Sequence, residues 1–394
     1  MRLYAIQLSL FLFSLTRALY TCANAKDFDQ KNPAFRETLT DAMKLEITDR
    51  FPIHKVIFKY SQPIGAGGFG EVREYKVGTE SIVIKRVEPK KPNHVAMLAK
   101  EIEILKLMCE LKVKFVYNKF IECQSKTIAR FYGCVEDGSE VYIFQEKMWM
   151  DMGSYQAYKN YNSLRGREKA NVMLQIISKF KELHEKHIVH GDIKPENLMI
   201  KGNDFNDIRI IDFGMSDYKG RASKGGSPYF ISPEQQKLGY LGVEGDIYSL
   251  AVTFAWMEES TQIFKSTKMD KKCSKPNELP PDDCVEKFRE GILASFNEYN
   301  ETRELLEVMT VAIAKEPFKR YRSMEEFWYA VKYAAQKLPS LSNPRKKKTE
   351  GVVGFIKNTL GFRILASDSL HQSSGKLANR ILAESGDFGT KMII

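Results

Sequence analysis

Cysteine is scarce in this sequence, and no apolar run is long enough to cross a membrane. Six cysteines occur among 394 residues and none forms a C-x-x-C pair, so a zinc site is not expected. The apolar stretch at residues 3–15 has thirteen residues, whereas a spanning helix needs about twenty. There is no internal repeat, and 43% hydrophobic with 28% charged residues is the composition of an ordinary globular protein.

The first residues match a secretory signal peptide. Arg2 supplies the positive start, residues 3–15 supply the apolar part, and Ala23-Asn24-Ala25 fits a small-x-small cleavage site. We therefore predict a signal peptide over residues 1–25 and secretion of a mature chain that begins at Lys26. A buried N-terminal helix is the alternative.

Five cysteines remain after that cleavage, so at least one thiol would stay free. Cys273 and Cys284 bracket a polar segment and could close a disulfide loop in an oxidising compartment. Cys109 falls in a predicted helix and is expected in the core. Asn300-Glu301-Thr302 is a glycosylation sequon.

The net charge of +10 is compatible with an acidic partner, an anionic membrane surface or high solubility. Part of it is a basic run at residues 345–348, which precedes an apolar-rich stretch at residues 351–365. A solvated charge run, a nuclear-import signal and contact with anionic lipid remain open for this run. No nucleic-acid partner is expected, and the sequence does not indicate an oligomeric state.

The hydrophobic pattern divides the chain into a mixed part and a helical part. Strand patterns cover residues 55–87 and 128–148, and the second includes an Asp-Gly hairpin signal. A helix at 94–111 lies between them. A short amphipathic helix at 32–48 precedes them, either packed on the fold or removable as a pro-segment. Beyond Gly153, a polar loop is expected at 258–283 and helices at 168–186, 247–257, 284–296, 302–314 and 323–337.

Two clusters of polar residues carry the chemistry. Residues 190–197 read His-Gly-Asp-Ile-Lys-Pro-Glu-Asn, and residues 212–214 read Asp-Phe-Gly. Two carboxylates, a lysine and an asparagine on neighbouring loops can hold divalent metal against a polyphosphate and orient a hydroxyl. Upstream, residues 64–72 match G-x-G-x-x-G-x-V, and residues 82–85 read Ile-Val-Ile-Lys. Strand patterns flank this glycine loop, whereas the Rossmann fingerprint opens a helix.

In these four motifs the chain resembles the eukaryotic protein kinases, over about residues 54–338. The resemblance implies an α+β, bilobal fold, with a small lobe of antiparallel sheet plus one helix at 54–148 and a large, mainly helical lobe at 149–338. Residues 26–53 would be an N-terminal extension, and residues 339–394 a basic, amphipathic tail. ATP and Mg²⁺ would bind between the lobes.

The resemblance assigns the nucleotide contacts. Lys85 would bind the α- and β-phosphates and pair with a helical glutamate, for which Glu101 has the right helical face. At the adenine hinge, Glu146 and Met148 would face the base, with Gln145 as gatekeeper. The remaining expected ATP-binding residues form the glycine loop: Ile64, Gly65, Ala66, Gly67, Gly68, Phe69, Gly70, Glu71 and Val72.

The resemblance also assigns the catalytic roles. Asp192 would orient the substrate hydroxyl or accept its proton, and Lys194 would offset the charge of the transferring phosphate. Asn197 and Asp212 would bind the metal ion. The chain departs from the family at Gly191, where an arginine that pairs with a phosphate on the activation loop is usual. This departure implies a kinase that is active without that switch or is regulated otherwise.

Residues 226–234 resemble the end of a kinase activation segment. Ser227 takes the position of its threonine and could bridge Asp192 and Lys194. With Lys194 two residues after Asp192, the chain resembles Ser/Thr kinases more than Tyr kinases. The same resemblance gives structural roles to four further residues: His190, Asp246, Glu234 and Arg320, the last two as a buried ion pair.

These residues predict a secreted Ser/Thr protein kinase that transfers the γ-phosphate of ATP to Ser or Thr hydroxyls of a protein. The alternative is a secreted pseudokinase that acts as a binding module, which the presence of Lys85, Asp192, Asn197 and Asp212 disfavours. Residues 226–234 argue against a small-molecule kinase. A signal peptide combined with a basic tail also fits delivery into a host cell.

Overall fold

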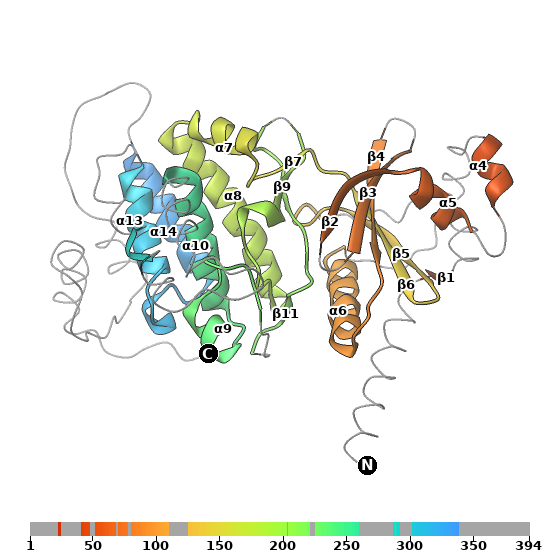
Figure 1. The fold of residues 1–394 in the computed structure, drawn as a ribbon. Coiled ribbons are helices and arrows are strands. Elements are labelled where there is room, and N and C mark those ends of the chain that lie inside the picture. Colours follow the sequence, from red (N-terminus) through yellow and green to blue (C-terminus); the bar gives the residue numbers. More distant parts are fainter. Residues whose placement is uncertain are drawn as a thin grey trace, which may run out of the picture. The chain divides into compact units, whose positions relative to one another are not determined.

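The structure is a computed structural model (Figure 1). It describes residues 23–24, 41–47, 52–67, 70–77, 80–109, 125–202, 204–220, 225–259, 287, 289–291 and 302–338. These residues fall into two compact units. The first lies within Met1–Asp151 and includes Asn197–Ser216, and the second comprises Met152–Glu196 and the chain from Asp217 onward. Within the described part, no helix combines the length and apolarity needed to cross a membrane.

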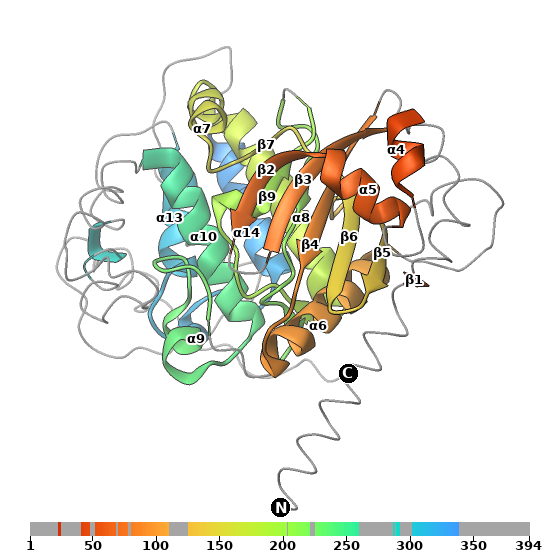
Figure 2. The ribbon, with the colours of Figure 1, turned by 45° about the vertical axis from the view of Figure 1, so that its right-hand side comes forward.

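The first unit is built on a six-stranded sheet, seen from two directions in Figures 1 and 2. The strand order is β1-β5-β6-β4-β3-β2, and every neighbouring pair is antiparallel except β1 with β5. The strands are β1 (Ala23–Asn24), β2 (Gln62–Gly67), β3 (Gly70–Val77), β4 (Glu80–Val87), β5 (Phe131–Asp137) and β6 (Glu140–Glu146). The predicted hairpin is confirmed, since β5 and β6 pair across a tight turn at Gly138.

Strand β4 separates two environments, because successive side chains of a strand point to opposite faces. Ile82 and Ile84 are buried in a core that also contains residues of helix α5 (Ile53–Tyr60). Lys85, on the other face, contacts helix α6 (Pro92–Met108), which confirms the helix predicted at 94–111. Each face of the sheet is therefore packed against a helix.

Residues 55–60 are helical, so the prediction of a strand that begins at residue 55 was wrong. Ile53, Val56 and Ile57 of α5 are buried at helical spacing, although their branched side chains also favour strands. Of the helix predicted at 32–48, the described part is α4 (Asp41–Glu46), whose Met43 joins the same core.

A second, small sheet completes the first unit. It contains β7 (Met150–Asp151), β9 (Leu198–Ile200) and β10 (Ile208–Ile210), in the order β10-β9-β7. A bridge between Ile128 and Ile210 links it to the chain just ahead of β5. The small sheet therefore holds residue 197, just ahead of β9, and residue 212, just beyond β10, within the first unit.

The second unit is mainly helical. Its longer helices are α7 (Tyr155–Asn162), α8 (Gly166–Glu185), α10 (Val243–Glu259), α13 (Arg303–Ala312) and α14 (Met324–Lys337). Shorter elements are α9 (Pro233–Leu238), a 3₁₀ turn at Pro317–Lys319, and the strand pair β8 (Ile188–Val189) with β11 (Asp217–Tyr218). As predicted, the helix at 247–257 is buried, since Ile247, Leu250 and Phe254 are inaccessible.

Several sequence predictions lie largely or wholly outside the described residues. The signal peptide is described only at Ala23–Asn24, and the helix at 284–296 only at residue 287 and residues 289–291, which are helical. Cys273, Cys284, Asn300 and the tail from residue 339 fall outside. Cys109 is buried, as expected, and both Cys109 and Cys134 are disulfide-bonded, so neither is a free thiol.

Candidate active site

The glycine loop joins β2 and β3 of the first unit, with Gly67 paired to Gly70. Gly70 has φ = 148°, and a Cβ there would lie 2.0 Å from the carbonyl oxygen of Arg86, so only glycine fits. Val72 pairs with Lys85 across β3 and β4, which places the loop beside the lysine. Two of the expected loop residues, Gly68 and Phe69, lie outside the described residues.

Lys85 and Glu101 form the predicted pair. The Lys85 Nζ atom donates to both carboxylate oxygens of Glu101, at 2.8 and 3.0 Å, and lies 4.0 Å from Asp212 Oδ1. Burial opposes the charge of Lys85, but the two carboxylates outweigh it and raise the pKa of the ammonium. Lys85 therefore stays protonated, which is the form that the phosphate contact expected from the sequence requires.

The carboxylate of Asp212 is open to a ligand, because its side chain is 42% exposed. Its backbone has φ = 62°, a left-handed conformation that is costly outside glycine and concentrates at functional sites. The N–H of the preceding Ile211 donates to the Asn197 carbonyl at 3.1 Å, so Asn197 lies beside this turn. One carboxylate and one amide oxygen, with phosphate and water, are a donor set that suits Mg²⁺.

The catalytic-loop residues meet in the second unit. The Asp192 Oδ2 atom accepts from Lys194 Nζ at 2.9 Å, and Oδ1 accepts from the Ser227 N–H at 2.6 Å. Lys194 Nζ also donates to the hydroxyl of Ser227 at 2.7 Å, so Ser227 does bridge the two residues. Burial alone would raise the pKa of Asp192, but the charge of Lys194 and these hydrogen bonds hold it below its usual value.

The backbone of the catalytic loop is held from α10. The carboxylate of Asp246 accepts from the N–H groups of His190 and Gly191, at 2.8 and 2.9 Å, and contacts His184 Nε2 at 2.8 Å. The His190 ring is fully buried and lies edge-on to Phe180. Asp246 and His190 are thus structural supports, as expected.

Comparison with known proteins decides the family. A model described as the protein kinase domain matches residues 58–328, well over half of the chain. The chain belongs to the protein kinase family.

Curated relatives agree with this assignment. The MAP kinase kinase skh1/pek1 of Schizosaccharomyces pombe is 26% identical over 257 residues, which cover 63% of this chain and 65% of the relative. The serine/threonine-protein kinase sid1 of the same organism is 23% identical over 52% of this chain and 41% of its own. The probable serine/threonine-protein kinase MARK-A of Dictyostelium discoideum is 30% identical over 48% of this chain and 17% of its own. The chain thus spans less than two thirds of the length of these relatives.

The kinase also contains the expected buried ion pair. Arg320 donates to both carboxylate oxygens of Glu234, at 2.7 and 2.9 Å, from the segment that follows α13. This pair anchors the end of segment 226–234 to the helical unit.

The hinge of the kinase leaves β6 at Glu146. The side chain of Glu146 is buried and forms an ion pair with Lys201 at 2.6 Å, so only its backbone is left for the adenine contact expected from the sequence. Met148 is buried two residues later, and the N–H of Trp149 donates to the Ile200 carbonyl. These bonds hold residues 146–149 against the small sheet of the first unit.

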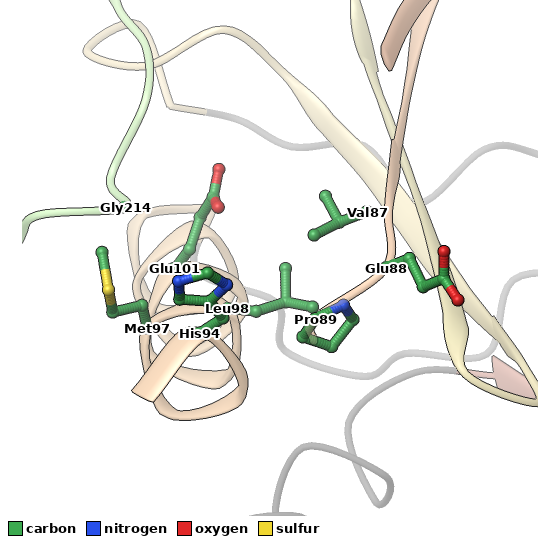
Figure 3. A pocket seen from close by; sticks show the side chains of 8 residues that line it. All are labelled: Val87, Glu88, Pro89, His94, Met97, Leu98, Glu101 and Gly214. Atoms are coloured by element: carbon green, nitrogen blue, oxygen red, sulfur yellow. The ribbon is translucent and has the colours of Figure 1, made fainter. Parts of the chain in front are cut away.

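A small cavity lies beside Glu101 of α6 (Figure 3). It is lined by Val87, Glu88, Pro89, His94, Met97, Leu98, Glu101 and Gly214. Its volume of about 20 Å³ has room for one or two water molecules, whereas ligand pockets measure roughly 300–1,000 Å³. This cavity is therefore too small to be a nucleotide site.

The structure brings the predicted residues together within each unit. Lys85, Glu101 and Asp212 meet in the first, and Asp192, Lys194 and Ser227 meet in the second. Sequence reasoning missed Gln235, whose buried side chain binds the catalytic loop. Only its place directly after the Pro233-Glu234 motif could have drawn attention to it.

Proposed function

We propose that this protein is an active Ser/Thr protein kinase, which transfers the γ-phosphate of ATP to a serine or threonine hydroxyl of another protein. The observation that carries the proposal is the Asp192–Lys194–Ser227 cluster. An ionised carboxylate stands beside a lysine and a segment of the type that shapes a peptide site. A degenerate kinase fold has no need of this set of charges.

The chain's own residues account for the steps around the phosphate. Lys85, kept protonated by Glu101, would hold the α- and β-phosphates, while Asp212 and Asn197 have the oxygens that suit Mg²⁺. Mg²⁺, when bound, neutralises charge on the phosphates. Asp192 would accept or orient the proton of the attacking hydroxyl, and Lys194 would offset charge on the transferring group.

Phosphate transfer from radiolabelled ATP to generic protein substrates tests this proposal. Asp192→Ala and Lys85→Met should each lower the rate at least a hundredfold, since each removes a group that acts on the reacting atoms. Asp204→Ala and Lys159→Met change the same residue types at exposed positions and should leave the rate unchanged. Equal labelling by wild type and Asp192→Ala would remove the catalytic assignment. ATP binding without any transfer would favour the binding-module alternative.

We further propose that the kinase is secreted and could be delivered into another cell. The predicted signal peptide supports this proposal, as do the disulfides of Cys109 and Cys134, which persist in oxidising compartments. Sequencing of the mature N-terminus tests it. A chain that starts at Lys26 would support secretion, and it would lack β1. A chain that keeps Met1 would contradict secretion.

A further inference from the structure

Gly191 is held at both ends of its backbone. It has φ = 75°, which glycine adopts without strain. Its N–H donates to Asp246 Oδ1 at 2.9 Å, and its carbonyl accepts from Gln235 Nε2 at 2.7 Å. The residue ahead of Asp192 is thus fixed by side chains from α10 and α9.

The same amide nitrogen reaches a second chain segment. Gln235 Nε2 also donates to the carbonyl of Gly225 at 3.1 Å. Two residues after Gly225, Ser227 donates its N–H to the carboxylate of Asp192. One side chain therefore joins the two stretches of backbone that meet at Asp192.

We propose that Gln235 is a positioning residue of this kinase, whose amide holds the catalytic loop and the activation segment in register around Asp192. The inference rests on the proposed kinase function. Both partners are carbonyl oxygens, which only accept, so the group between them must carry two donor hydrogens. A primary amide does. Gln235 is 2% exposed, so water cannot readily take its place.

Close packing at the same point makes the register sensitive to this contact. Gly226 has φ = 135°, and a Cβ there would lie 3.4 Å from the Gly191 carbonyl oxygen and 3.1 Å from Ile231 Cδ1. The two stretches therefore approach each other with little room to spare. The amide of Gln235 is neutral and needs no phosphate to hold the two stretches together. This suits a chain in which Gly191 replaces the arginine that usually pairs with a phosphate on the activation loop.

The test compares Gln235→Leu and Gln235→Glu with wild type. Both should lower kcat tenfold or more, because displacement of a catalytic group by about 1 Å can cost a hundredfold. The Kd for ATP, measured by direct binding, should change less than twofold, since Lys85, Glu101 and Asp212 belong to the other unit. In Gln235→Glu, kcat relative to wild type should rise as the pH falls from 8 to 6, because a protonated carboxyl regains one donor.

Gln156→Glu is the matched control. The side-chain amide of Gln156 is exposed on α7 and donates to the Asn160 side chain one turn away in the same helix. This variant should behave as wild type. A Gln235→Leu kcat within twofold of wild type would overturn the inference, and so would a Gln235→Glu pH profile parallel to that of wild type.

Hydrogen exchange separates this inference from the proposed function. Amides of residues 225–231 should exchange faster in Gln235→Leu than in wild type, while those of α14 should not, whether or not phosphate is transferred. Unchanged exchange there would contradict the positioning role. Absent transfer by wild type would instead contradict the kinase assignment.

Discussion

Arg320 is buried with every N–H group of its guanidinium engaged. Besides the two bonds to Glu234, it donates to the carbonyls of Ala314, Glu244 and Lys315, at 2.7, 3.0 and 3.0 Å. Its side chain is inaccessible to solvent. The planar fork of arginine can satisfy all of these acceptors, whereas lysine has three donors at a single point.

Arg320→Lys should therefore destabilise the second unit despite keeping the charge. At least two bonds are lost, and each buried acceptor left without a donor costs about 1–3 kcal/mol, so a loss of about 2–6 kcal/mol is expected. Urea unfolding measures it. Arg303→Lys is the matched control, because Arg303 is 58% exposed and lies 3.4 Å from Glu307. Equal stability of both variants would show that the charge alone matters.

Residues that form a motif could be predicted individually, because the resemblance to protein kinases gives each motif position a role and helical spacing selects Glu101. Lys194 is two positions from Asp192, and the face of α6 that carries Leu98 and Leu105 also carries Glu101. Gln235 could not be predicted in this way. Its partners are the backbone carbonyls of residues 191 and 225. Every residue has a backbone carbonyl, so the sequence does not indicate which of them accept from a side chain.

At the scale of an element, helix α5 shows that the hydrophobic pattern alone cannot distinguish a helix from a strand. The ring of Phe58 contacts two guanidinium groups, with the Cζ atoms of Arg73 and Arg86 at 4.8 and 4.9 Å from its ring centre. Glu71 accepts from both arginines, and Arg73 also donates to the carbonyls of residues 58, 59 and 61 at the end of the helix. These contacts from β3 and β4 stabilise α5. A strand pattern ignores them, which explains the wrong prediction for residues 55–60.

Phe58→Ala should accordingly lower the free energy of unfolding by about 3–5 kcal/mol. Phe58→Leu keeps most of the apolar volume but loses both cation–ring contacts, so a smaller loss of about 1–2 kcal/mol is expected. Thermal unfolding measures the stability of both variants. Phe318→Ala is the control, because the side chain of Phe318 is 70% exposed. If Phe58→Ala were as stable as this control, α5 would not be part of the core.

At the scale of the whole molecule, the bilobal α+β kinase fold followed from the four motifs, but the grouping of segments did not. Residues 197–216 fall in the first unit because β9 pairs with β7 on one side and with β10 on the other, and because Ile210 bridges to Ile128. Such pairings join residues far apart in sequence, and short apolar strands do not specify their partners.

The disulfide bonds of Cys109 and Cys134 should make the stability of the fold depend on the redox state of its compartment. Cys109 ends α6 and Cys134 lies in β5, so both half-cystines belong to the unit that holds Lys85 and Glu101. Loss of a native disulfide costs roughly 2–5 kcal/mol, so a reductant should lower the Tm on the order of 10 °C. If the protein is secreted as proposed, Cys109 and Cys134 should resist alkylation until reduced, as peptide mass spectrometry can show. Ready alkylation of both without a reductant, with no change of Tm, would place this kinase in a reducing compartment instead.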